Sequence, residues 1–453
     1  MEMEKNDIIK LEITGLTSEG SGVGRYEGMA VFVPLTAVGD VILCRIVKVL
    51  KSYAYGKAEE LLQASPDRVH NECPHFGKCG GCTFRHISYG AELRAKDGFV
   101  RDAFERIGGL SPEFMPICGS ESDSGYRNKL QMPVAKSDIG EVFCGFYSER
   151  SHRVTPIRKC LLQPEIFSGI TEFIIQQVKK LNISVYNEHK HEGVLRHIFL
   201  RRGHYSGEIS LCLVARRKTP ELVKLAKCTM KRFPEIKGAA LNINKEKTNV
   251  ILGRDEITLF GDPVIRDTMC GNAVTISPKS FYQVNTPAAE RLYAQAADFA
   301  EPAGKAVLDL YCGAGTIGLS MAKQAGRIIG AEIIPEAVEN ARLNAALNGC
   351  LNAEFICADA GEAAEMLAEK GTRPDVIVLD PPRRGCDEKT LCACAEMSPE
   401  RIVMISCNPA TAARDCKRLS QLGYVTERVR AFDLFPRTGH VECVCLITKK
   451  LMW

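Results

Sequence analysis

The sequence predicts a multidomain α/β protein. We expect an N-terminal OB-like β-barrel over residues 1–63, a central α+β domain over residues 70–270 and a C-terminal Rossmann-like α/β domain over residues 271–453. Short β-rich runs with glycine turns come first, hairpin-like strand pairs follow, and strands then alternate with helices. A chain of 453 residues is long enough for about three domains of ordinary size.

The barrel is predicted from five closely spaced strand-like runs between residues 7 and 62. This spacing indicates a small Greek-key barrel of the OB type. Basic and aromatic side chains interleave there: Arg45, Lys48, Lys51, Lys57, Tyr53 and Tyr55. Such barrels often bind single-stranded nucleic acid through a basic groove and stacking rings. A barrel with solvated strands has the same pattern, so the fold alone does not decide.

The central region mixes strands with helices. A linker at residues 65–72 leads to a helical stretch, and the helical part at about 89–120 is able to pack with the C-terminal domain instead. Further helical patterns occur at residues 164–181 and 220–233. Basic side chains crowd this region: Arg196, His197, Arg201, Arg202, Arg216, Arg217, Lys218, Lys231 and Arg232. They either neutralise phosphates of a polyanion or form solvated strand faces, and the two interpretations are equally supported.

The C-terminal region reads as a parallel sheet. The buried-strand runs AVLDLYC, RIIGAEI, AEFICAD, DVIVLD and RIVMIS are separated by helix candidates such as PEAVENARLNAALNG, whose final glycine suits a helix C-cap. Strands that alternate with helices in this way favour a doubly wound parallel sheet.

The composition is that of a soluble globular protein, with 45% apolar and 25% charged residues and a net charge of +4. The N-terminus MEMEKNDIIK lacks the apolar stretch of a signal peptide, and no apolar run approaches the length of a membrane span. We therefore expect a cytoplasmic protein. In a reducing compartment most of its 20 cysteines pack as small apolar residues.

A nucleotide-cofactor loop is predicted at residues 308–319, LDLYCGAGTIGL, between a strand and a helix. Glycines let the backbone turn tightly at the carboxyl end of the strand, where open α/β sheets bind ligands. Glu332 ends the next strand, where it can hold both ribose hydroxyls, and Asp359 closes the third, facing the adenine amino group. Asp309 precedes the turn and discourages phosphates. The pattern therefore favours S-adenosylmethionine over a nicotinamide cofactor.

Cys407 is the candidate nucleophile. It ends a strand in IVMISCNPATAARD, and the following Asn-Pro forces a turn that exposes its side chain. Asp380 begins the rigid corner DPPRRG after the preceding strand, and Glu442 follows in GHVEC. The C5 carbon of uracil needs a thiolate at C6 before it can accept a methyl group, and a base must then remove the C5 proton. The thiolate is the reactive form, so a lowered pKa near Arg383 or a helix N-terminus would help.

Glu442 is the nearest plausible base, and His440 is a secondary candidate that could equally be a structural histidine. Taken alone, Cys407 could be a buried strand cysteine and Glu442 a surface residue. They become candidate site residues because the cofactor loop, the DPPRRG corner and both of these residues occur together in one chain.

Four other cysteines form a separate group: Cys73, Cys79, Cys82 and Cys160. Glycines at 77, 80 and 81 let the first three fold around an ion or cluster, and four thiolates hold an iron–sulfur cluster or a tetrahedral zinc. Zinc loops usually pair two short cysteine units, and the second unit is missing here. We prefer a structural or RNA-shaping [4Fe–4S] cluster and keep zinc as the alternative.

With these motifs together, the chain resembles the S-adenosylmethionine-dependent RNA uracil-5-methyltransferases. The resemblance runs nearly end to end, through the barrel, the cysteine group, SFYQVN at 280–285, the glycine loop, LDPPR, SCNPAT and HVE. The best match is the branch that acts on 23S ribosomal RNA and carries a TRAM barrel and a [4Fe–4S] cluster. Single motifs are not specific, but their combination is.

The resemblance implies that Cys407 is the nucleophile and that Glu442 removes the C5 proton. It implies cofactor contacts from Gln283, Tyr311, Thr316, Glu332, Asp359 and Asp380, and cluster ligands at Cys73, Cys79, Cys82 and Cys160. Relatives often carry Asn in place of Thr316, and the residue at Asp359 varies within the family. The implied partner is RNA, neither DNA nor a membrane, and we take the chain to act as a monomer.

Three rival functions remain. A transfer-RNA m5U methyltransferase is the nearest, although the common bacterial members lack both the barrel and the cysteine set. A non-catalytic RNA-binding or assembly factor is disfavoured because Cys407, Glu442 and Asp380 are all present. A cytosine-5 RNA methyltransferase is disfavoured because it normally carries a Pro-Cys pair after the fourth strand, and LDPPRRG has none.

Overall fold

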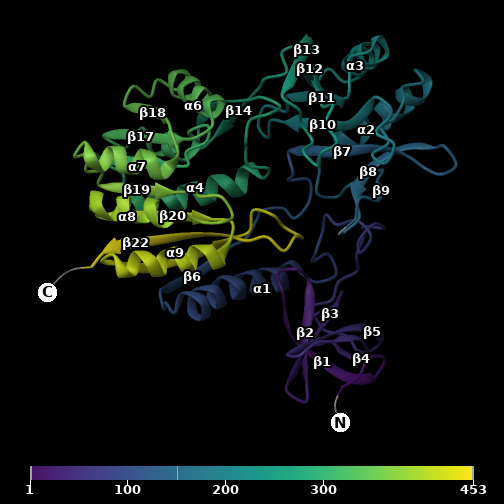
Figure 1. Cartoon of the computed structure of the whole chain (residues 1–453), viewed down its shortest axis with the longest axis horizontal. Coiled ribbons are helices and arrows are strands. Elements are labelled where there is room, and N and C mark those ends of the chain that lie inside the picture. Colours follow the sequence, from purple (N-terminus) through teal and green to yellow (C-terminus); the bar gives the residue numbers. More distant parts are fainter. Residues whose placement is uncertain (1–2, 150, 451–453) are drawn as a thin grey trace.

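The computed structural model describes residues 3–149 and 151–450, so the two ends of the predicted outer domains lie outside the described residues. Figure 1 shows three parts of the molecule: a small N-terminal barrel, a central sheet with its helices, and a larger layered C-terminal part. Among the described residues, every helix is too short or too polar to cross a bilayer.

The predicted N-terminal barrel is present and closed. Its strands pair in the order β1-β2-β3-β5-β4, and β4 pairs back with β1. Their bounds are Ile8–Leu16 (β1), Ser21–Tyr26 (β2), Met29–Pro34 (β3), Val41–Val49 (β4) and Tyr53–Gln63 (β5). Alternate side chains of β1 point inward and are buried, as a half-solvated strand requires. Closure removes the exposed sheet edges that otherwise invite aggregation.

The segment after the barrel returns to the C-terminal part of the molecule. It forms helix α1 (Tyr89–Asp102), which Ser88 caps, a π-helical turn (Ala103–Gly108) and strand β6 (Glu113–Cys118). The turn packs against α9, and β6 pairs in parallel with β21 at the edge of the C-terminal sheet. Residues 89–118 thus share the hydrophobic core of a sheet whose own strands begin much later in the chain.

The central part is a seven-stranded sheet in the order β13-β12-β11-β10-β7-β8-β9. The strands are β7 (Lys129–Lys136), β8 (Val142–Tyr147), β9 (Val154–Pro156), β10 (Leu195–Arg202), β11 (Ile209–Ala215), β12 (Ile236–Ile243) and β13 (Asp255–Gly261). Helices α2 (Glu165–Lys180) and α3 (Pro220–Arg232) cover one face through a common apolar core. Both predicted hairpins, β8 with β9 and β10 with β11, are present.

The C-terminal part is the predicted doubly wound sheet with three additions. Its order is β18-β17-β16-β19-β20-β22-β21-β6. The strands from β18 to β20 are parallel, and β22 lies antiparallel between β20 and β21. The bounds are β16 (Ala306–Leu310), β17 (Arg327–Glu332), β18 (Ala353–Cys357), β19 (Val376–Leu379), β20 (Arg401–Ser406), β21 (Tyr424–Phe432) and β22 (Glu442–Lys449).

Helices cover both faces of this sheet (Figure 1). One face packs against α1, α7 (Ala360–Glu369), α8 (Glu388–Met397) and α9 (Pro409–Gln421). The other packs against α4 (Thr286–Ala300), α5 (Thr316–Met321), α6 (Pro335–Leu347) and the hairpin of β14 (Ile265–Met269) and β15 (Asn272–Ile276). The carboxyl ends of the parallel strands are therefore left as the edge on which a ligand can bind.

Candidate active site

The glycine loop is built between β16 and α5 as the sequence predicts. Gly313 and Gly315 have φ values of +54° and +77°, which side chains other than glycine rarely adopt. A side chain at Gly315 would also press on the ring of Phe355 at 3.0 Å. Asp309 is buried beneath the loop, and its Oδ2 accepts a 2.9 Å hydrogen bond from the Gly318 amide. Asp309 therefore shapes the loop from below through a backbone contact.

Glu332 ends β17 beside this loop. Its Oε2 accepts from the Gly313 amide at 3.1 Å, and its Oε1 accepts from the Ile334 amide at 2.9 Å. These bonds fix the carboxylate, and each oxygen retains a further lone pair for a ligand hydroxyl. Ile333 and Ile334 are 60% and 53% exposed and offer an apolar surface next to it. A fixed carboxylate beside an apolar surface fits the ribose and adenine of S-adenosylmethionine.

Asp359 and Tyr311 lie at the same edge of the sheet but have structural partners. Asp359 follows β18 and caps α7, with Oδ1 accepting from the Gly361 amide at 2.9 Å. Tyr311 has a φ of +65°, and burial, followed by the neighbouring Cys386, raises the pKa of its hydroxyl. A hydrogen bond with Thr390 opposes that rise and directs the phenol toward α8. Their predicted cofactor contacts remain predictions.

Gln283, Thr316 and Asp380 meet around Tyr293, a residue that the sequence pattern did not single out. Tyr293 is buried in α4, and its hydroxyl lies 3.5 Å from Thr316 Oγ1. Burial and then the charge of Asp380 raise the pKa of this hydroxyl, whereas hydrogen bonds with Thr316 and Gln283 oppose the rise. An aromatic residue on an apolar helix face looks like core in a sequence. Only the fold shows that Tyr293 interacts with three predicted site residues.

Cys407 and Glu442 are brought together by strand pairing. In the antiparallel ladder between β20 and β22, Ser406 stands opposite Cys443. Cys407 follows β20 and Glu442 begins β22, so the next pair in that register is the thiol and the carboxyl. Asp380 follows β19, the other neighbour of β20. All three side chains therefore share one corner of the sheet, although β22 lies beyond the parallel strands that the sequence reveals.

The corner DPPRRG is tied to the turn that carries Cys407. The Asn408 side chain donates to the Arg383 carbonyl at 3.0 Å and also caps α9. Thr411 Oγ1 lies 3.3 Å from the same carbonyl. Asn408 and Pro409, which follow the thiol, turn the chain. The Asn408 side chain also joins the loop after β20 to the loop after β19.

Desolvation dominates the electrostatics of this corner. Burial raises the pKa of Glu442 to about 8, with a further rise from Asp380 and an opposing effect from Arg383. Burial also raises the pKa of Asp380 to about 7. Carboxyl groups this strongly shifted, with an electrostatic interaction between them, are typical of functional sites.

Burial dominates the pKa of Cys407. Burial, together with the charges of Glu442 and Asp380, raises the pKa of this thiol to about 11. Arg383 does reach the thiol and lowers the pKa by its charge and a hydrogen bond, but one cation does not offset burial and two carboxylates. The ligand-free site therefore holds a neutral thiol at neutral pH.

The four predicted cluster cysteines gather in one place. Cys82 is desolvated, and its pKa is raised further by Cys73 and Cys79. Burial, together with Cys82 and Cys79, raises the pKa of Cys160 to about 11. Within residues 3–149 and 151–450, however, no group of three or more His, Cys, Asp or Glu side chains stands in a metal-ligating arrangement. The donor chemistry fits a thiolate-bound metal, whereas the arrangement of the sulfurs is looser than ligation requires.

Three of the basic residues in the central cluster are buried in the fold. Arg196 is buried, and its guanidinium donates to the Asn244 and Glu246 carbonyls at 3.0 and 2.6 Å. His197 and Arg201 are buried as well. Arg217 and Lys218 are exposed and remain available to an anionic partner.

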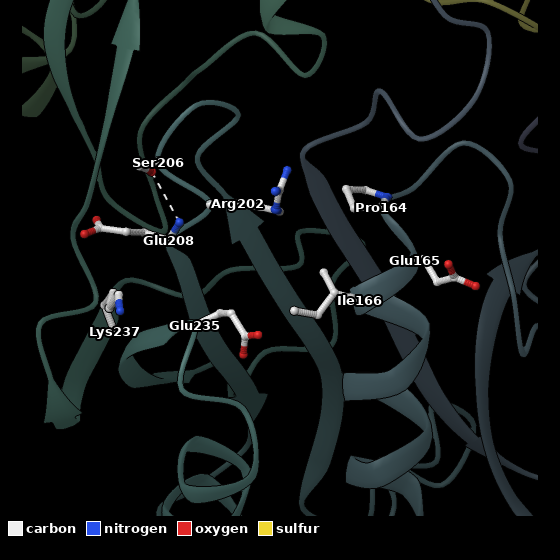
Figure 2. Close-up of a pocket in the computed structure, with 9 residues that line it drawn as sticks. Pro164, Glu165, Ile166, Arg202, Ser206, Glu208, Glu235 and Lys237 are labelled. Carbon is white, nitrogen blue, oxygen red and sulfur yellow. Dashed lines mark hydrogen bonds between the residues drawn. The ribbon is translucent and has the colours of Figure 1, made fainter.

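A separate cavity opens on the central part, between the start of α2 and the loop after β10 (Figure 2). Its lining mixes both charges, with Glu165, Glu235, Arg202 and Lys237 around it. The residues that line this cavity include none of the predicted site residues, so we assign it no part in the reaction.

A doubly wound sheet with a glycine loop after its first strand and a carboxylate at the end of its second fits the S-adenosylmethionine-dependent methyltransferase class. The sequence profile of the tRNA (Uracil-5-)-methyltransferase family matches residues 205–450, and that of the TRAM domain matches residues 3–58. The chain belongs to this family, as the resemblance predicted. It is an S-adenosylmethionine-dependent RNA uracil-5-methyltransferase with an N-terminal TRAM domain.

Relatives extend over the whole chain. An uncharacterized RNA methyltransferase of Halalkalibacterium halodurans is 41% identical over 451 residues, covering 99% of this chain and 98% of its own length. One of Clostridium acetobutylicum is 41% identical over 452 residues, with the same coverage. Among solved structures, the Pyrococcus abyssi tRNA (uracil-54, C5)-methyltransferase in complex with S-adenosyl-L-homocysteine is 28% identical. It has a TM-score of 0.78 and covers 97% of this chain and 100% of its own.

The raised pKa of Glu442 predicts a pH-dependent cost to stability. Between the ordinary value of 4.5 and about 8, the folded protein keeps a proton that the unfolded chain has lost, so stability falls as pH rises through this window. Glu442→Gln removes that cost. We expect its melting temperature to exceed that of the parent at pH 8.5, by about 2–4 °C per kcal/mol relieved, and to equal it near pH 4.5.

Calorimetric scans of the ligand-free protein at both pH values test this expectation. Glu396→Gln makes the same chemical change at an exposed position of α8 and is expected to change neither melting temperature. An equal gain at both pH values would show that Glu442 is not a desolvated acid.

Proposed function

We propose that this enzyme methylates C5 of a specific uridine in 23S ribosomal RNA through a covalent bond between Cys407 and C6 of the uracil, with Glu442 as the base. The register of β20 and β22 carries the proposal, because it makes the thiol and the carboxyl neighbours at the ligand edge of the sheet. Arg383 and Asp380 interact electrostatically with both groups. A nucleophile, a base and a cation in one desolvated corner fit covalent catalysis.

The reaction begins at the thiol. The Cys407 thiolate forms a bond from Sγ to C6 of the uracil, and the C5–C6 π electrons move to give an enolate. S-adenosylmethionine, when bound, supplies the electrophilic methyl group and a positive charge. The enolate carbon C5 takes this methyl group, the donor is left as neutral S-adenosyl-L-homocysteine, and Glu442 then takes the C5 proton. The electrons of that C–H bond restore the C5–C6 double bond and expel the Cys407 thiolate, so the nucleophile is regenerated.

The pKa values assign the protonation states. Glu442, with a pKa of about 8, is the strongest carboxylate base among the acids in this corner and holds a proton well after it accepts one. Cys407 needs help to ionise because its pKa is about 11 in the ligand-free site. A positive charge next to Asp380 and Glu442 lowers both acid pKa values and that of the thiol. We therefore propose that Cys407 becomes reactive after the methyl donor is in place.

We propose that Glu332 binds the ribose hydroxyls, and that Gln283, Thr316 and Asp380 line the methyl-donor side of the pocket. The fixed Glu332 carboxylate and the cluster of these three around Tyr293 support this arrangement. Tyr311 and Asp359 complete the proposed cofactor set at the same sheet edge. Tyr293 is a further pocket residue that we add to it.

The barrel offers an RNA-binding surface. Phe32, Tyr53 and Tyr55 form an aromatic group with ring centroids 5.5 to 6.0 Å apart, and Tyr55 is 43% exposed. Lys48 pairs with Tyr55 in the strand register. Of the other barrel cations, Arg45 and Lys57 bind Glu59 at 3.0 and 3.7 Å. Rings with neighbouring lysines stack bases and contact phosphates, which supports RNA as the partner.

We further propose that Cys73, Cys79, Cys82 and Cys160 bind a [4Fe–4S] cluster with a structural role. Their convergence around a glycine-containing loop supports thiolate ligation. A zinc ion is the alternative, because four thiolates also suit tetrahedral zinc.

Cys407→Ala tests the nucleophile. Because the thiol supplies the covalent step, we expect methyl transfer to fall by more than about 10⁴-fold. Binding of S-adenosylmethionine, measured by equilibrium dialysis, is expected to stay within about twofold, since Cys407 is not in the proposed cofactor set. Cys392→Ala, an exposed thiol on α8, is the matched control and is expected to keep full activity. Full activity of Cys407→Ala would refute the covalent mechanism.

Tritium release distinguishes the two RNA classes. Ribosomal RNA and transfer RNA transcripts carrying C5-tritiated uracil are incubated with the enzyme and S-adenosylmethionine, since methylation at C5 expels the C5 proton. The barrel and the full cysteine set favour 23S RNA. The end-to-end likeness to a transfer-RNA enzyme of Pyrococcus abyssi is the observation that favours the alternative. We expect release from 23S RNA, and release from transfer RNA alone would replace that assignment.

Anaerobic purification tests the cluster. A [4Fe–4S] protein is expected to be brown, with broad visible absorption and about four irons per chain, and Cys82→Ser is expected to lower the iron content. Cys228→Ser, a cysteine of α3 outside the group, is expected to leave the iron content unchanged. A colourless protein with one zinc per chain would establish the alternative.

A further inference from the structure

The segment from residue 433 to 441 delivers Glu442 to the active site. It connects β21 to β22 and belongs to neither strand. In Figure 1 it is the yellow loop that projects from the C-terminal sheet toward the middle of the molecule. A loop of this length has no ladder of its own to hold it, so side chains and neighbouring segments must fix its conformation.

Arg437 is the most strongly bound residue of this segment. Its guanidinium donates to Asp123 Oδ2 from Nε at 2.8 Å and to the Ile87 carbonyl from Nη1 at 2.9 Å. Its backbone amide donates to Glu92 Oε1 at 2.7 Å. The side chain is only 12% exposed. Burial alone would raise the pKa of Asp123, but the hydrogen bond and charge of Arg437 hold it below its ordinary value.

The carbonyl of Arg437 binds the end of the cysteine loop. It accepts hydrogen bonds from the amides of Thr83 at 2.7 Å and Phe84 at 3.1 Å, the two residues that follow Cys82. Arg437 has a φ of +69°, a left-handed conformation that is unfavourable for a long side chain. Such strain persists only where the surroundings over-determine the backbone, and strained residues of this kind cluster at functional sites.

The flanks of Arg437 are anchored as well. Lys96, fully buried in α1, donates to Asp433 Oδ1 at 2.7 Å and to the Phe435 carbonyl at 3.2 Å. The Tyr126 hydroxyl donates to the Pro436 carbonyl at 2.9 Å. On the other side, a Cβ added to Gly439 would approach the Ser18 carbonyl oxygen to 1.7 Å, so the barrel turn after β1 lies directly against the segment.

We propose that Arg437 is a positioning residue for the base, through which the order of the cysteine loop sets the place of Glu442. This inference rests on the proposed function of Glu442. The guanidinium fastens the segment to Asp123 and the Ile87 carbonyl, the backbone amide fastens it to Glu92 of α1, and the carbonyl of the same residue holds the residues after Cys82. Displacement of a reacting group by about 1 Å costs on the order of a hundredfold in rate. A loosened cysteine loop therefore slows proton removal by displacing Glu442.

The reaction step that slows in a variant of Arg437 identifies the role of this residue. Methyl transfer precedes proton removal, so a misplaced Glu442 leaves the methylated RNA bound to Cys407. We expect Arg437→Ala to lower turnover by about a hundredfold and to accumulate this covalent adduct, seen as a slower band on denaturing gels. Arg437→Lys keeps the positive charge but loses the planar guanidinium, whose separate nitrogens donate to Asp123 and Ile87. We therefore expect a smaller loss of turnover than in Arg437→Ala. Glu442→Gln is the reference and is expected to accumulate the same adduct.

Hydrogen exchange provides a readout that does not depend on activity. In the full-length protein, the amides of Thr83 and Phe84 are expected to lose protection in Arg437→Ala, because their acceptor sits on a loosened segment. Arg401→Ala is the matched control. Arg401 is 21% exposed, binds Glu301 at 2.7 Å and begins β20 at the end remote from Cys407. We expect it to change neither the adduct nor these amides.

The outcomes separate the two proposals. An adduct in Glu442→Gln, combined with low turnover and no adduct in Arg437→Ala, would show that Arg437 acts only through general stability and overturn the inference. No adduct in Glu442→Gln would remove the base assignment itself, and the inference with it. If Arg437→Ala fails to fold, Asp123→Asn keeps the guanidinium and its contact with Ile87. The same adduct and exchange pattern is then expected at smaller amplitude, and its absence would contradict the coupling.

Discussion

The antiparallel pairing of β20 with β22 is the constraint on which the active site depends. In a parallel sheet the carboxyl ends of all strands lie at one edge. Parallel strands therefore bring to this edge only residues that follow a strand, as Asp380 and Cys407 do. Because β22 runs the other way, its first residue lies at the same edge. Glu442 thereby stands across from Cys407 without any long loop at the point of contact. Backbone hydrogen bonds with β20 on one side and β21 on the other fix the register of β22, and with it the position of Glu442.

Desolvation is the second constraint, and it acts against stability. Asp309, Asp380 and Glu442 all hold their protons far above the ordinary pH range for carboxyl groups because the fold removes water from around them. The ligand-free protein keeps this cost, and a cationic ligand relieves it. The same environment raises the pKa of Cys407, so the enzyme at rest carries an unreactive thiol. In the proposed mechanism the thiol ionises only after the methyl donor has bound, which protects it from reaction with other electrophiles.

Much of this fold could be predicted from local patterns. The five barrel strands, both central hairpins and the five parallel strands are continuous runs whose burial alternates or persists over a few residues, and all are present. The glycine loop and Glu332 follow from the same local signals. Partners that are far apart in sequence could not be predicted. The pairing of β6 with β21, the buried bond between Lys96 and Asp433 and the place of Tyr293 are set by tertiary packing. The raised pKa of Cys407 could not be predicted either, because a sequence shows the nearby arginine and hides the burial.

The placement of β6 has a consequence for synthesis of the chain. Phe114 pairs with Val429, so the edge of the C-terminal sheet is built from a strand near the beginning of the chain and one near its end. At about 5–20 residues per second, a ribosome needs roughly 15–60 s to make the intervening sequence. During that time α1 and β6 have emerged without the core that buries them, next to a barrel that is already able to close. The nascent protein therefore carries an unpaired strand and an apolar helix face for most of its translation, and both are covered only when the last two strands leave the ribosome.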